Sequence, residues 1–396
     1  MELSKEVQLL TSSPTLEIST KSKELKKQGH KVIDLSLGEP DFNTPLYINK
    51  AAKKAIDDGH TKYTASDGIY ELKKAIIEKL EQDNNLIYYP DEIIVTTGAK
   101  FALYEIFKLL INEGDEVIIP TPYWVSYPAQ VRMAGAKPVY IKGEEKNKFK
   151  ITKQQLEETI TSKTKLLILN SPNNPTGMLY SEEELKALGD ICVKNNILIV
   201  SDEIYEKLVY TNSPHVSIAS LSSYLKSQTI IVNGVSKSHA MTGWRLGYVA
   251  GPRDIIKHMK KISSQTTSNP SSISQYAALE AYSNERENKI NEAHMKRVFK
   301  KRLKYLYASM ELIPGIMCQK PQGAFYIFPN VKEAATKNGF ASVDDWTKAL
   351  LDEKKVALVP GSSFGAPDNV RISYIVSENL LGESIERISE FIKKYT

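Results

Sequence analysis

The sequence has 396 residues, of which 41% are hydrophobic and 25% charged, with 20 glycines and 18 prolines spread along the chain. This composition is typical of a globular protein with room for two domains, and it argues against a disordered or repetitive chain. The net charge of +5, from 52 basic and 47 acidic residues, mildly favours anionic ligands and does not indicate nucleic-acid binding.

The N-terminal segment is predicted to form an arm with a charged helix and then a strand over Val32–Leu37. Gly38 follows this strand, and it either turns the chain towards the next helix or lets the backbone approach a ligand closely. That next helix is predicted to have Thr44 as its N-cap and Pro45 at its first position. A loop that begins at Tyr63 leads into a further helix with an apolar face.

Seven short apolar segments are predicted as strands, and most are separated by segments of helical length. They are Ile93–Thr97, Val117–Pro120, Pro138–Ile141, Lys165–Asn170, Ile197–Ser201, Thr229–Val232 and Leu246–Ala250. This alternation predicts an α/β fold with a mostly parallel seven-stranded sheet and helices on both faces. Ligands of such a sheet bind beyond the carboxyl ends of the strands.

The C-terminal part of the chain predicts a second, smaller α+β domain. A long helix is expected from about Glu285 to Leu312, followed by short strands and helices. We expect residues 1–43 to form the arm and part of the small domain, residues 44–285 the large cofactor-binding domain, and residues 286–396 the small domain.

Two predicted strand ends carry residues suited to an anion or a polar ligand. Gly98, Ala99 and Lys100 form a turn between a strand and a helix, where backbone N–H groups and the helix dipole favour an anion. Most such turns bind nothing, so the pattern alone is a weak indication. Asn174, within SPNNPTG, either binds a ligand through its amide or belongs to an ordinary turn.

Two further strand ends carry charged residues. Asp202 directly follows a strand, with Tyr205 three residues later, and its carboxylate suits a cationic ligand or simply caps the next segment. Lys237 is a lone lysine just beyond Thr229–Val232. A desolvated lysine has a lowered pKa and can form a Schiff base, whereas Arg245, eight residues on, suits a phosphate. The alternative is that both are solvated charges.

These residue types together meet the needs of pyridoxal 5′-phosphate. The cofactor accepts electrons only while its ring nitrogen is protonated, and a buried carboxylate such as Asp202 stabilises that form. Asn174 and Tyr205 are candidate donors to the ring oxygen. Trp124 is a candidate to stack on the ring, unless it is only a core aromatic.

The motifs SPNNPTG, SDEIY, GVSKSHAMTGWRLGY and VRISY follow LGEPDF and TGAK in the chain. Together they resemble the class I pyridoxal-phosphate aminotransferases of fold type I, from about residue 30 to the C-terminus. Within this family the chain is most similar to bacterial aspartate aminotransferases. The resemblance implies transfer of the amino group of L-aspartate to 2-oxoglutarate, giving oxaloacetate and L-glutamate. Aromatic, prephenate, kynurenine and alanine-type aminotransferases are the alternatives.

The resemblance implies roles around the cofactor ring. Lys237 would form the Schiff base and then move a proton between the substrate Cα and the cofactor. Asp202 would pair with the ring nitrogen, and Tyr205 and Asn174 would bind the ring oxygen. Trp124 would stack on the ring.

The resemblance also implies a phosphate site. The turn 98–100 and Arg245 would bind the phosphate, and Tyr63 would reach the phosphate of the neighbouring subunit, which makes the active unit a homodimer. Many relatives carry serine where this chain has Gly234, so Ser236 is a weakly supported replacement.

For the substrate, the resemblance implies that Arg371 binds the α-carboxylate with help from the backbone at Gly38, beside Trp124 and Asn174. In the animal-like branch an arginine from the other subunit binds the distal carboxylate, but Ser263–Ser274 contains no arginine. Lys100 is therefore predicted to bind the distal carboxylate, unless it only adds charge at the phosphate.

Other classes of function fit less well. No GxGxxG follows a predicted strand and no GxxxxGK[ST] occurs, so neither a nicotinamide dehydrogenase nor a nucleotide triphosphatase is expected. A pyridoxal-binding transcription regulator would need a DNA-binding domain, for which about thirty N-terminal residues leave no room. The sequence shows no membrane span, signal peptide or metal-ligand spacing, and Cys192 and Cys318 are expected to be core thiols, so a cytoplasmic enzyme is predicted.

Overall fold

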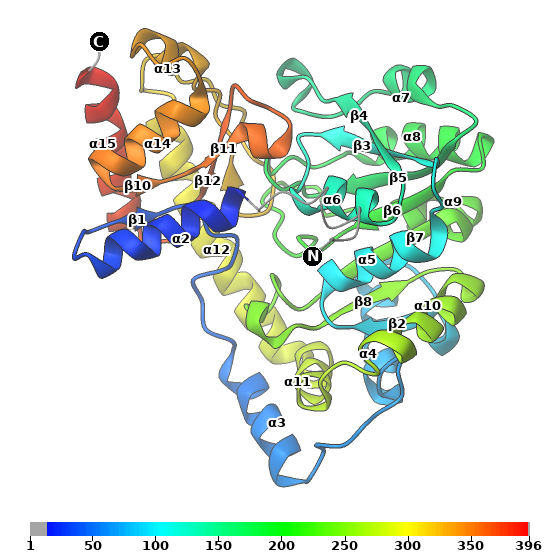
Figure 1. Ribbon diagram of the computed structural model, residues 1–396. Coiled ribbons are helices and arrows are strands. Elements are labelled where there is room, and N and C mark those ends of the chain that lie inside the picture. Colours follow the sequence, from blue (N-terminus) through cyan, green and yellow to red (C-terminus); the bar gives the residue numbers. More distant parts are fainter. Residues whose placement is uncertain (1–13, 395–396) are drawn as a thin grey trace, which may run out of the picture.

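A seven-stranded sheet with the order β2-β8-β7-β6-β5-β3-β4 forms the centre of the larger part of the computed structural model, which describes residues 14–394 (Figure 1). Its strands are β2 (Ile93–Thr96), β3 (Glu116–Thr121), β4 (Lys137–Lys142), β5 (Thr164–Asn170), β6 (Leu198–Asp202), β7 (Thr229–Gly234) and β8 (Gly247–Ala250). Neighbouring strands pair in parallel except β8, which is antiparallel to both β2 and β7. The predicted mostly parallel seven-stranded sheet is confirmed.

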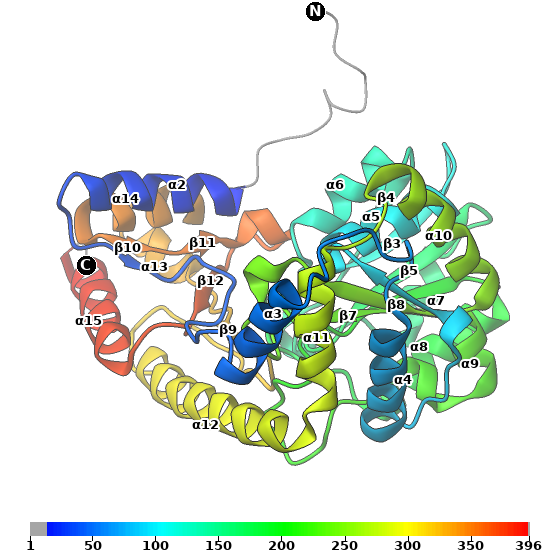
Figure 2. The ribbon, with the colours of Figure 1, turned by 90° about the horizontal axis from the view of Figure 1, so that it is seen from below.

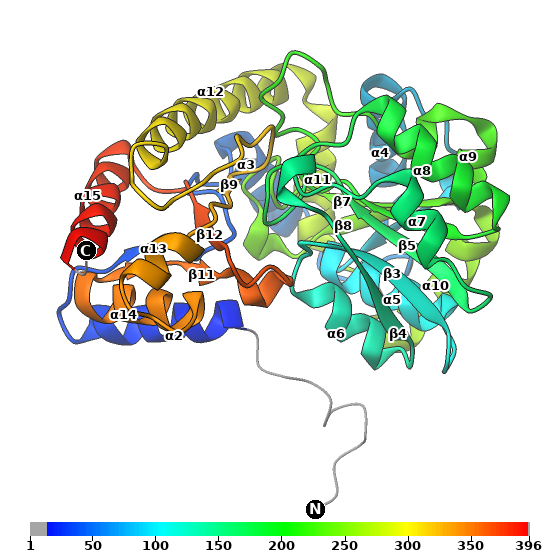
Figure 3. The ribbon, with the colours of Figure 1, turned by 90° about the horizontal axis from the view of Figure 1, so that it is seen from above.

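Helices cover both faces of this sheet, because successive side chains of a strand point to opposite sides (Figure 3). One face packs against α5 (Ala99–Leu110), α6 (Ser126–Met133) and α10 (Arg253–Thr266). The other packs against α4 (Tyr70–Asn84), α8 (Glu182–Lys194), α9 (Ser223–Gln228) and α11 (Ser272–Ser283), with α3 (Leu46–Asp57) on α11 and α7 (Lys153–Thr159) beside α8.

Two small sheets form the second part of the molecule. In the first, β1 (Ile33–Asp34) pairs in parallel with β10 (Val356–Ala357). The second has the antiparallel order β11-β12-β9, from β9 (Tyr326–Ile327), β11 (Val359–Pro360) and β12 (Val370–Ser373). The helices of this part are α2 (Pro14–Lys27), α12 (Glu285–Met310), α13 (Lys332–Lys337), α14 (Val343–Lys354) and α15 (Glu378–Lys394).

The N-terminal segment belongs physically to this second part. Figure 2 shows α2 lying along α14, and Leu25 packs with Leu351 and Ala357 in one apolar cluster. The predicted strand Val32–Leu37 is shorter than expected, because only two residues find partners in the short β10. We keep the division into residues 1–43, 44–285 and 286–396 as a proposal; residues 1–13 of the arm lie outside the described part.

The core of the second part reaches the large sheet through the turn that follows β6. Phe299 and Leu303 of α12 share an apolar cluster with Phe325 of the segment before β9 and with Tyr205 and Leu208 of that turn. The two parts therefore meet beside the carboxyl end of β6. Within residues 14–394, no helix is long and apolar enough to span a bilayer.

The predicted N-cap Thr44 is wrong. Pro45 occupies the N-cap position of α3, without a side-chain cap. The Thr44 hydroxyl instead donates to the carbonyl of Ala240 at 2.8 Å and accepts from the indole N–H of Trp244 at 3.0 Å. The polar groups of the loop after β7 need hydrogen-bond partners. The Thr44 hydroxyl serves them instead of capping the helix as the local sequence had predicted.

Candidate active site

The carboxyl ends of neighbouring parallel strands bring the predicted residues together. Asp202 ends β6, while Asn174 and Lys237 lie in the loops after β5 and β7, its two neighbours in the sheet. The turn at Gly98 follows β2, and Trp124 follows β3, at the same edge. The sheet thus converts residues far apart in the chain into one site.

Lys237 lies partly buried in the loop after β7. Its Nζ donates to the carbonyl oxygen of Gly38 at 2.5 Å, and it lies 5.9 Å from the centre of the Phe325 ring. Burial lowers the pKa of Lys237 to about 8; Glu39 opposes this shift and Arg371 adds to it. A substantial fraction of the amine is therefore neutral near pH 8, as a nucleophile requires.

Asp202 is a buried carboxylate whose side-chain partners are both uncharged. The Tyr127 hydroxyl donates to Oδ2 at 2.6 Å, and the backbone N–H of Ile204 donates to Oδ1 at 3.3 Å. Burial raises the pKa of Asp202 to about 6, although the bond from Tyr127 opposes the shift. None of the hydrogen-bond donors to this carboxylate is a cation. A protonated ring nitrogen would supply one.

Tyr127 was missed at the sequence level. It lies in α6, 75 residues from Asp202, and is 2% exposed. The only available signal was the apolar surroundings of TPYWVSYP, which equally indicate a core aromatic.

Arg371, Asn174, Tyr205 and Tyr326 form a buried polar cluster. Arg371 Nη1 donates to Asn174 Oδ1 at 3.1 Å, and its guanidinium lies 4.6 Å from the centre of the Tyr326 ring. The hydroxyls of Tyr205 and Tyr326 lie 2.9 Å apart. Tyr326, in GAFYIFP, was also missed, because an aromatic in an apolar strand normally indicates core.

Arg371 has the properties of an anion-binding residue. It is 3% exposed, its Nη2 donates to the carbonyl of Ser36 at 2.6 Å, and its buried Nε has no partner among the described residues. All its hydrogen-bond acceptors are neutral. Since a buried guanidinium is costly without a negative partner, the geometry suits a carboxylate ligand.

The turn after β2 forms a cationic pocket with Arg245. Gly98 has a φ of 83°, and a Cβ there would lie 2.7 Å from Arg245 Nη2, so glycine lets the guanidinium approach the start of α5. Gly247 has a similar role, since its Cβ would lie 2.5 Å from the backbone N of Ala99. Two basic side chains and a helix N-terminus meet here, which suits a phosphate.

Lys100 extends from this turn over the face of Trp124. Its Nζ lies 5.0 Å from the centre of the indole ring. Burial lowers the pKa of Lys100, and the nearby Arg245 adds a smaller effect in the same direction. The ammonium thus lies near both Arg245 and the Trp124 ring, which leaves its two predicted roles open.

The remaining predicted residues are placed less directly. Ser236 is buried near Lys237, at 8% exposure. A Cβ at Gly234 would lie 2.8 Å from both Gly247 Cα and the carbonyl oxygen of Leu246, so the close approach of β7 and β8 explains why serine is not found at 234. Tyr63 is 89% exposed and lies outside the buried cluster of its own chain.

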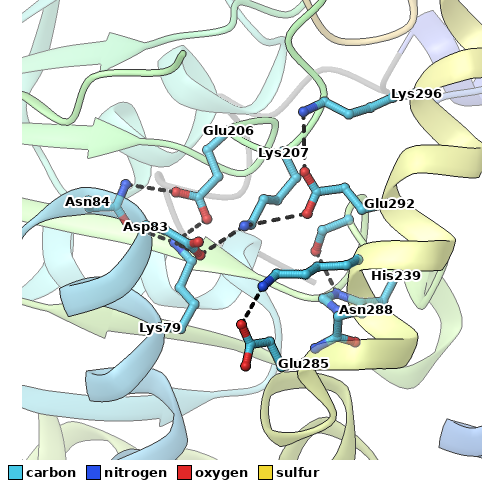
Figure 4. A network of polar contacts seen from close by, with 12 residues as sticks. Lys79, Asp83, Asn84, Glu206, Lys207, His239, Glu285, Asn288, Glu292 and Lys296 are labelled. Atoms are coloured by element: carbon cyan, nitrogen blue, oxygen red, sulfur yellow. Dashed lines mark hydrogen bonds and ion pairs between the residues drawn. The ribbon is translucent and has the colours of Figure 1, made fainter.

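An ionic network supports the turn that carries Tyr205 (Figure 4). Glu206 pairs with Lys79 and accepts from Asn84 at 3.0 Å, while Lys207 pairs with Asp83 at 2.9 Å. Burial alone would raise the pKa of Glu206, but Lys79 and other cations lower it to about 2. The network anchors the turn to α4, and sequence reasoning gave no sign of it.

The same network reaches α12, and a separate contact joins α12 to the loop after Lys237 (Figure 4). Lys207 also pairs with Glu292 of α12 at 3.5 Å. His239, two residues after Lys237, is bonded to Ser238 Oγ at 2.8 Å and to Asn288, and burial lowers its pKa to about 4. His239 is therefore neutral and serves as a positional anchor for the loop.

Glu203, Glu206 and His215 bring possible metal-ligand atoms within 4.8 Å of one another. Their oxygens already accept protein hydrogen bonds: Glu203 Oε1 accepts from Ser201 at 2.8 Å and from Ser217 at 2.7 Å, and Glu206 is paired as described above. We therefore regard the group as part of the structural network.

The chain is similar to known proteins over nearly its whole length. The family model "Aminotransferase class I and II" matches residues 30–388. The aspartate aminotransferase of Bacillus subtilis (strain 168) is 58% identical over 396 residues, covering 100% of both chains. The aspartate aminotransferase of Geobacillus stearothermophilus is 58% identical over 393 residues, covering 99% of each. The solved structure of aspartate aminotransferase from Thermus thermophilus with maleate has a TM-score of 0.94 at 38% identity, covering 99% of this chain and 100% of that one.

Proposed function

The chain belongs to the class I and II aminotransferases, and we propose that it binds pyridoxal 5′-phosphate at Lys237 and uses the residues around that lysine for transamination. The reaction moves the amino group of L-aspartate to 2-oxoglutarate, giving oxaloacetate and L-glutamate. The observation that carries this function is the convergence of three groups at the sheet edge: the partly buried Lys237 amine, the buried Asp202 carboxylate with neutral partners, and the buried Arg371 guanidinium without a carboxylate.

The residues fit the cofactor. When bound, pyridoxal 5′-phosphate supplies a carbonyl carbon for a Schiff base and a protonated ring that accepts the electron pair released at the substrate Cα. Asp202 would hold the ring-nitrogen proton, because its carboxylate otherwise lacks a cationic partner. Tyr205 and Asn174 would bind the ring oxygen, and Trp124 would stack on the ring.

The phosphate would lie at the cationic pocket. The backbone N–H groups of Ala99 and Lys100 at the start of α5, with Arg245 directly beside Gly98, would bind its oxygens. Ser236 is a further candidate ligand.

Lys237 would also transfer the proton. With a pKa lowered to about 8, its neutral amine is basic enough to take the proton from the substrate Cα. The ammonium that this forms is acidic enough to give the proton back. The bond between His239 and Asn288 of α12 would help to hold the loop that follows Lys237.

The substrate would be oriented by its carboxylates. Arg371 would bind the α-carboxylate through its two-pronged guanidinium, with the Gly38 backbone alongside. Lys100 would bind the distal carboxylate of aspartate or glutamate from its place over Trp124.

We propose a cytoplasmic homodimer with shared active sites. The exposed Tyr63 is accompanied by large apolar side chains of α3 and α4, with Leu46 at 67%, Ile56 at 51% and Tyr70 at 57% exposure, which suits a surface covered by a second copy. Cys192 and Cys318 are free thiols, in keeping with a reducing compartment.

Two measurements test the function. Borohydride reduction of the holoenzyme should attach the cofactor to Lys237, as shown by mass spectrometry of the peptide. A panel of amino donors with 2-oxoglutarate should then give the highest kcat/KM for aspartate, compared with asparagine, alanine, kynurenine and phenylalanine. A higher value for phenylalanine than for aspartate would replace the acidic assignment with an aromatic one.

A further inference from the structure

We propose that Arg302, on α12, is a positioning residue that holds the segment 38–43 over the active site through Asp41. The inference rests on the proposed function, because it concerns the binding of the substrate carboxylate. Segment 38–43 carries the carbonyl of Gly38, which accepts from Lys237, and it follows Ser36, whose carbonyl accepts from Arg371.

Arg302 and Asp41 form a two-pronged ion pair. Nη1 donates to Asp41 Oδ1 and Nη2 to Oδ2, both at 2.8 Å. The arginine side chain is 9% exposed and that of the aspartate 32%. The guanidinium is also placed by the carbonyl of Tyr374 at 3.5 Å and the Phe299 ring at 5.8 Å. A buried, oriented arginine loses little entropy on binding a carboxylate, so the pair is a firm anchor.

Segment 38–43 depends on side-chain anchors. It makes no main-chain hydrogen bond with any main-chain group of residues 14–394. Besides Asp41 and the bond from Lys237 to Gly38, its side-chain contacts include the exposed bond from Thr242 Oγ1 to Glu39 Oε2 at 2.8 Å. Phe42 makes edge contacts with Phe299 and His294, whose ring centres lie 5.4 Å and 5.7 Å away. Of the contacts outside the reacting groups, the Asp41–Arg302 pair is the ionic one, and its arginine is shielded from solvent although Asp41 is partly exposed.

The anchor also differs from the contact between Gly38 and Lys237. That contact uses the lysine nitrogen itself, which the proposed chemistry requires for other bonds. The Asp41–Arg302 pair lies outside the reacting groups, so it can keep the segment in place while Lys237 reacts.

Loss of the anchor should weaken substrate binding more than turnover. If segment 38–43 occupies its binding position for only about a tenth of the time, the apparent dissociation constant rises about tenfold, while the complex once formed has the same geometry. We expect Arg302→Lys, which keeps the charge and loses the two-pronged geometry, to raise KM for aspartate about tenfold with kcat changed less than about twofold.

The test compares Arg302→Lys with Arg286→Lys, an exposed arginine of the same helix without a contact to segment 38–43. Both holoenzymes are assayed with aspartate, titrated with maleate as a non-reacting dicarboxylate, and followed by amide hydrogen exchange of the peptide covering residues 36–44. Arg302→Lys should show the KM effect, weaker maleate binding and faster exchange in that peptide, whereas Arg286→Lys should match the wild type. Asp41→Asn should reproduce Arg302→Lys, and the double variant should cost no more than either single change.

Each result has a defined meaning. An unchanged KM and unchanged amide hydrogen exchange in folded Arg302→Lys would overturn the positioning role. A fall in kcat as large as the rise in KM, with unchanged amide hydrogen exchange, would overturn it as well. Inactivity of the wild type towards aspartate would instead count against the proposed function. Because exchange is measured without turnover, the position of segment 38–43 is tested in either case.

Discussion

At the level of single residues, the buried Asp202 carboxylate suits the proposed chemistry but lowers the stability of the folded protein. Burial raises its pKa from 3.8 to about 6, so at neutral pH the cofactor-free protein holds a charge in a site that disfavours it. The folded state binds more protons than the unfolded state between these values, and stability therefore falls as pH rises through that window.

We predict that Asp202→Asn separates stability from activity. Turnover should fall on the order of 10²-fold, about 3 kcal/mol of transition-state stabilisation, because the ring-nitrogen proton loses its partner. The cofactor-free variant should be more stable than the wild type at pH 7 by up to about 3 kcal/mol, and it should lack the decline between about pH 4 and 6. Urea unfolding of both proteins across that pH range checks this. Parallel curves, or half-reaction rates near wild type, would contradict the assignment.

Lys100 is the residue that decides between acidic and aromatic substrates. We predict that Lys100→Ser lowers kcat/KM for aspartate about tenfold and leaves phenylalanine within about twofold, because only a dicarboxylate uses the ammonium over Trp124. Steady-state kinetics with both donors measure the difference. An equal loss for both donors, together with weaker cofactor retention, would show that Lys100 serves the phosphate.

Two glycines allow neighbouring secondary-structure elements to approach closely at the proposed phosphate site. β7 and β8 approach so closely at Gly234 that a Cβ there would lie 2.8 Å from backbone atoms of residues 246 and 247. On β8, a Cβ at Gly247 would lie 2.5 Å from the backbone N of Ala99 at the start of α5. This approach brings the start of α5 and Arg245 together and removes the space for a side chain at 234. The phosphate site is therefore built by backbone contact as much as by charged side chains.

We predict that Gly234→Ala lowers the free energy of unfolding by about 2 to 3 kcal/mol, since the backbone of β8 must move to admit the methyl group. Gly243→Ala is the matched control, because its added Cβ would meet nothing within 4 Å. Urea denaturation of the two variants gives the comparison. A similar midpoint for both would mean that the β7–β8 contact adapts more easily than the distances suggest.

At the scale of the whole molecule, the exposed Tyr63 indicates that one chain does not complete its own site. We predict that Tyr63→Phe and Lys237→Ala complement each other, because a hybrid dimer has one site with both native residues. If Tyr63→Phe alone costs about tenfold, subunit exchange in an equal mixture should raise activity about fivefold above the unmixed average. Activity is followed after denaturation and refolding together, with exchange verified by mass spectrometry. No rise despite verified exchange would argue against a shared site.

The strand pattern and the residue types at the strand ends can be predicted from the sequence. The seven strands were predicted to within one or two residues, because apolar β-branched runs closed by turn residues are local signals. Lys237, Asp202 and Asn174 were proposed as site residues because each stands in a short motif after a strand, and parallel strands with a common edge made their meeting expected. Arg371 was proposed from its motif alone, because it lies on β12 of the second part.

The residues that support the candidate site became visible only in the folded chain. Tyr127 lies 75 residues from Asp202, and Arg302 lies 261 residues from Asp41. Thr44 bonds to Ala240 and Trp244 rather than capping α3. Such contacts join segments distant in the chain, and each depends on burial and on the need of polar groups for partners. No local period or spacing encodes them, so they exist only once the sheet and α12 have brought the segments together.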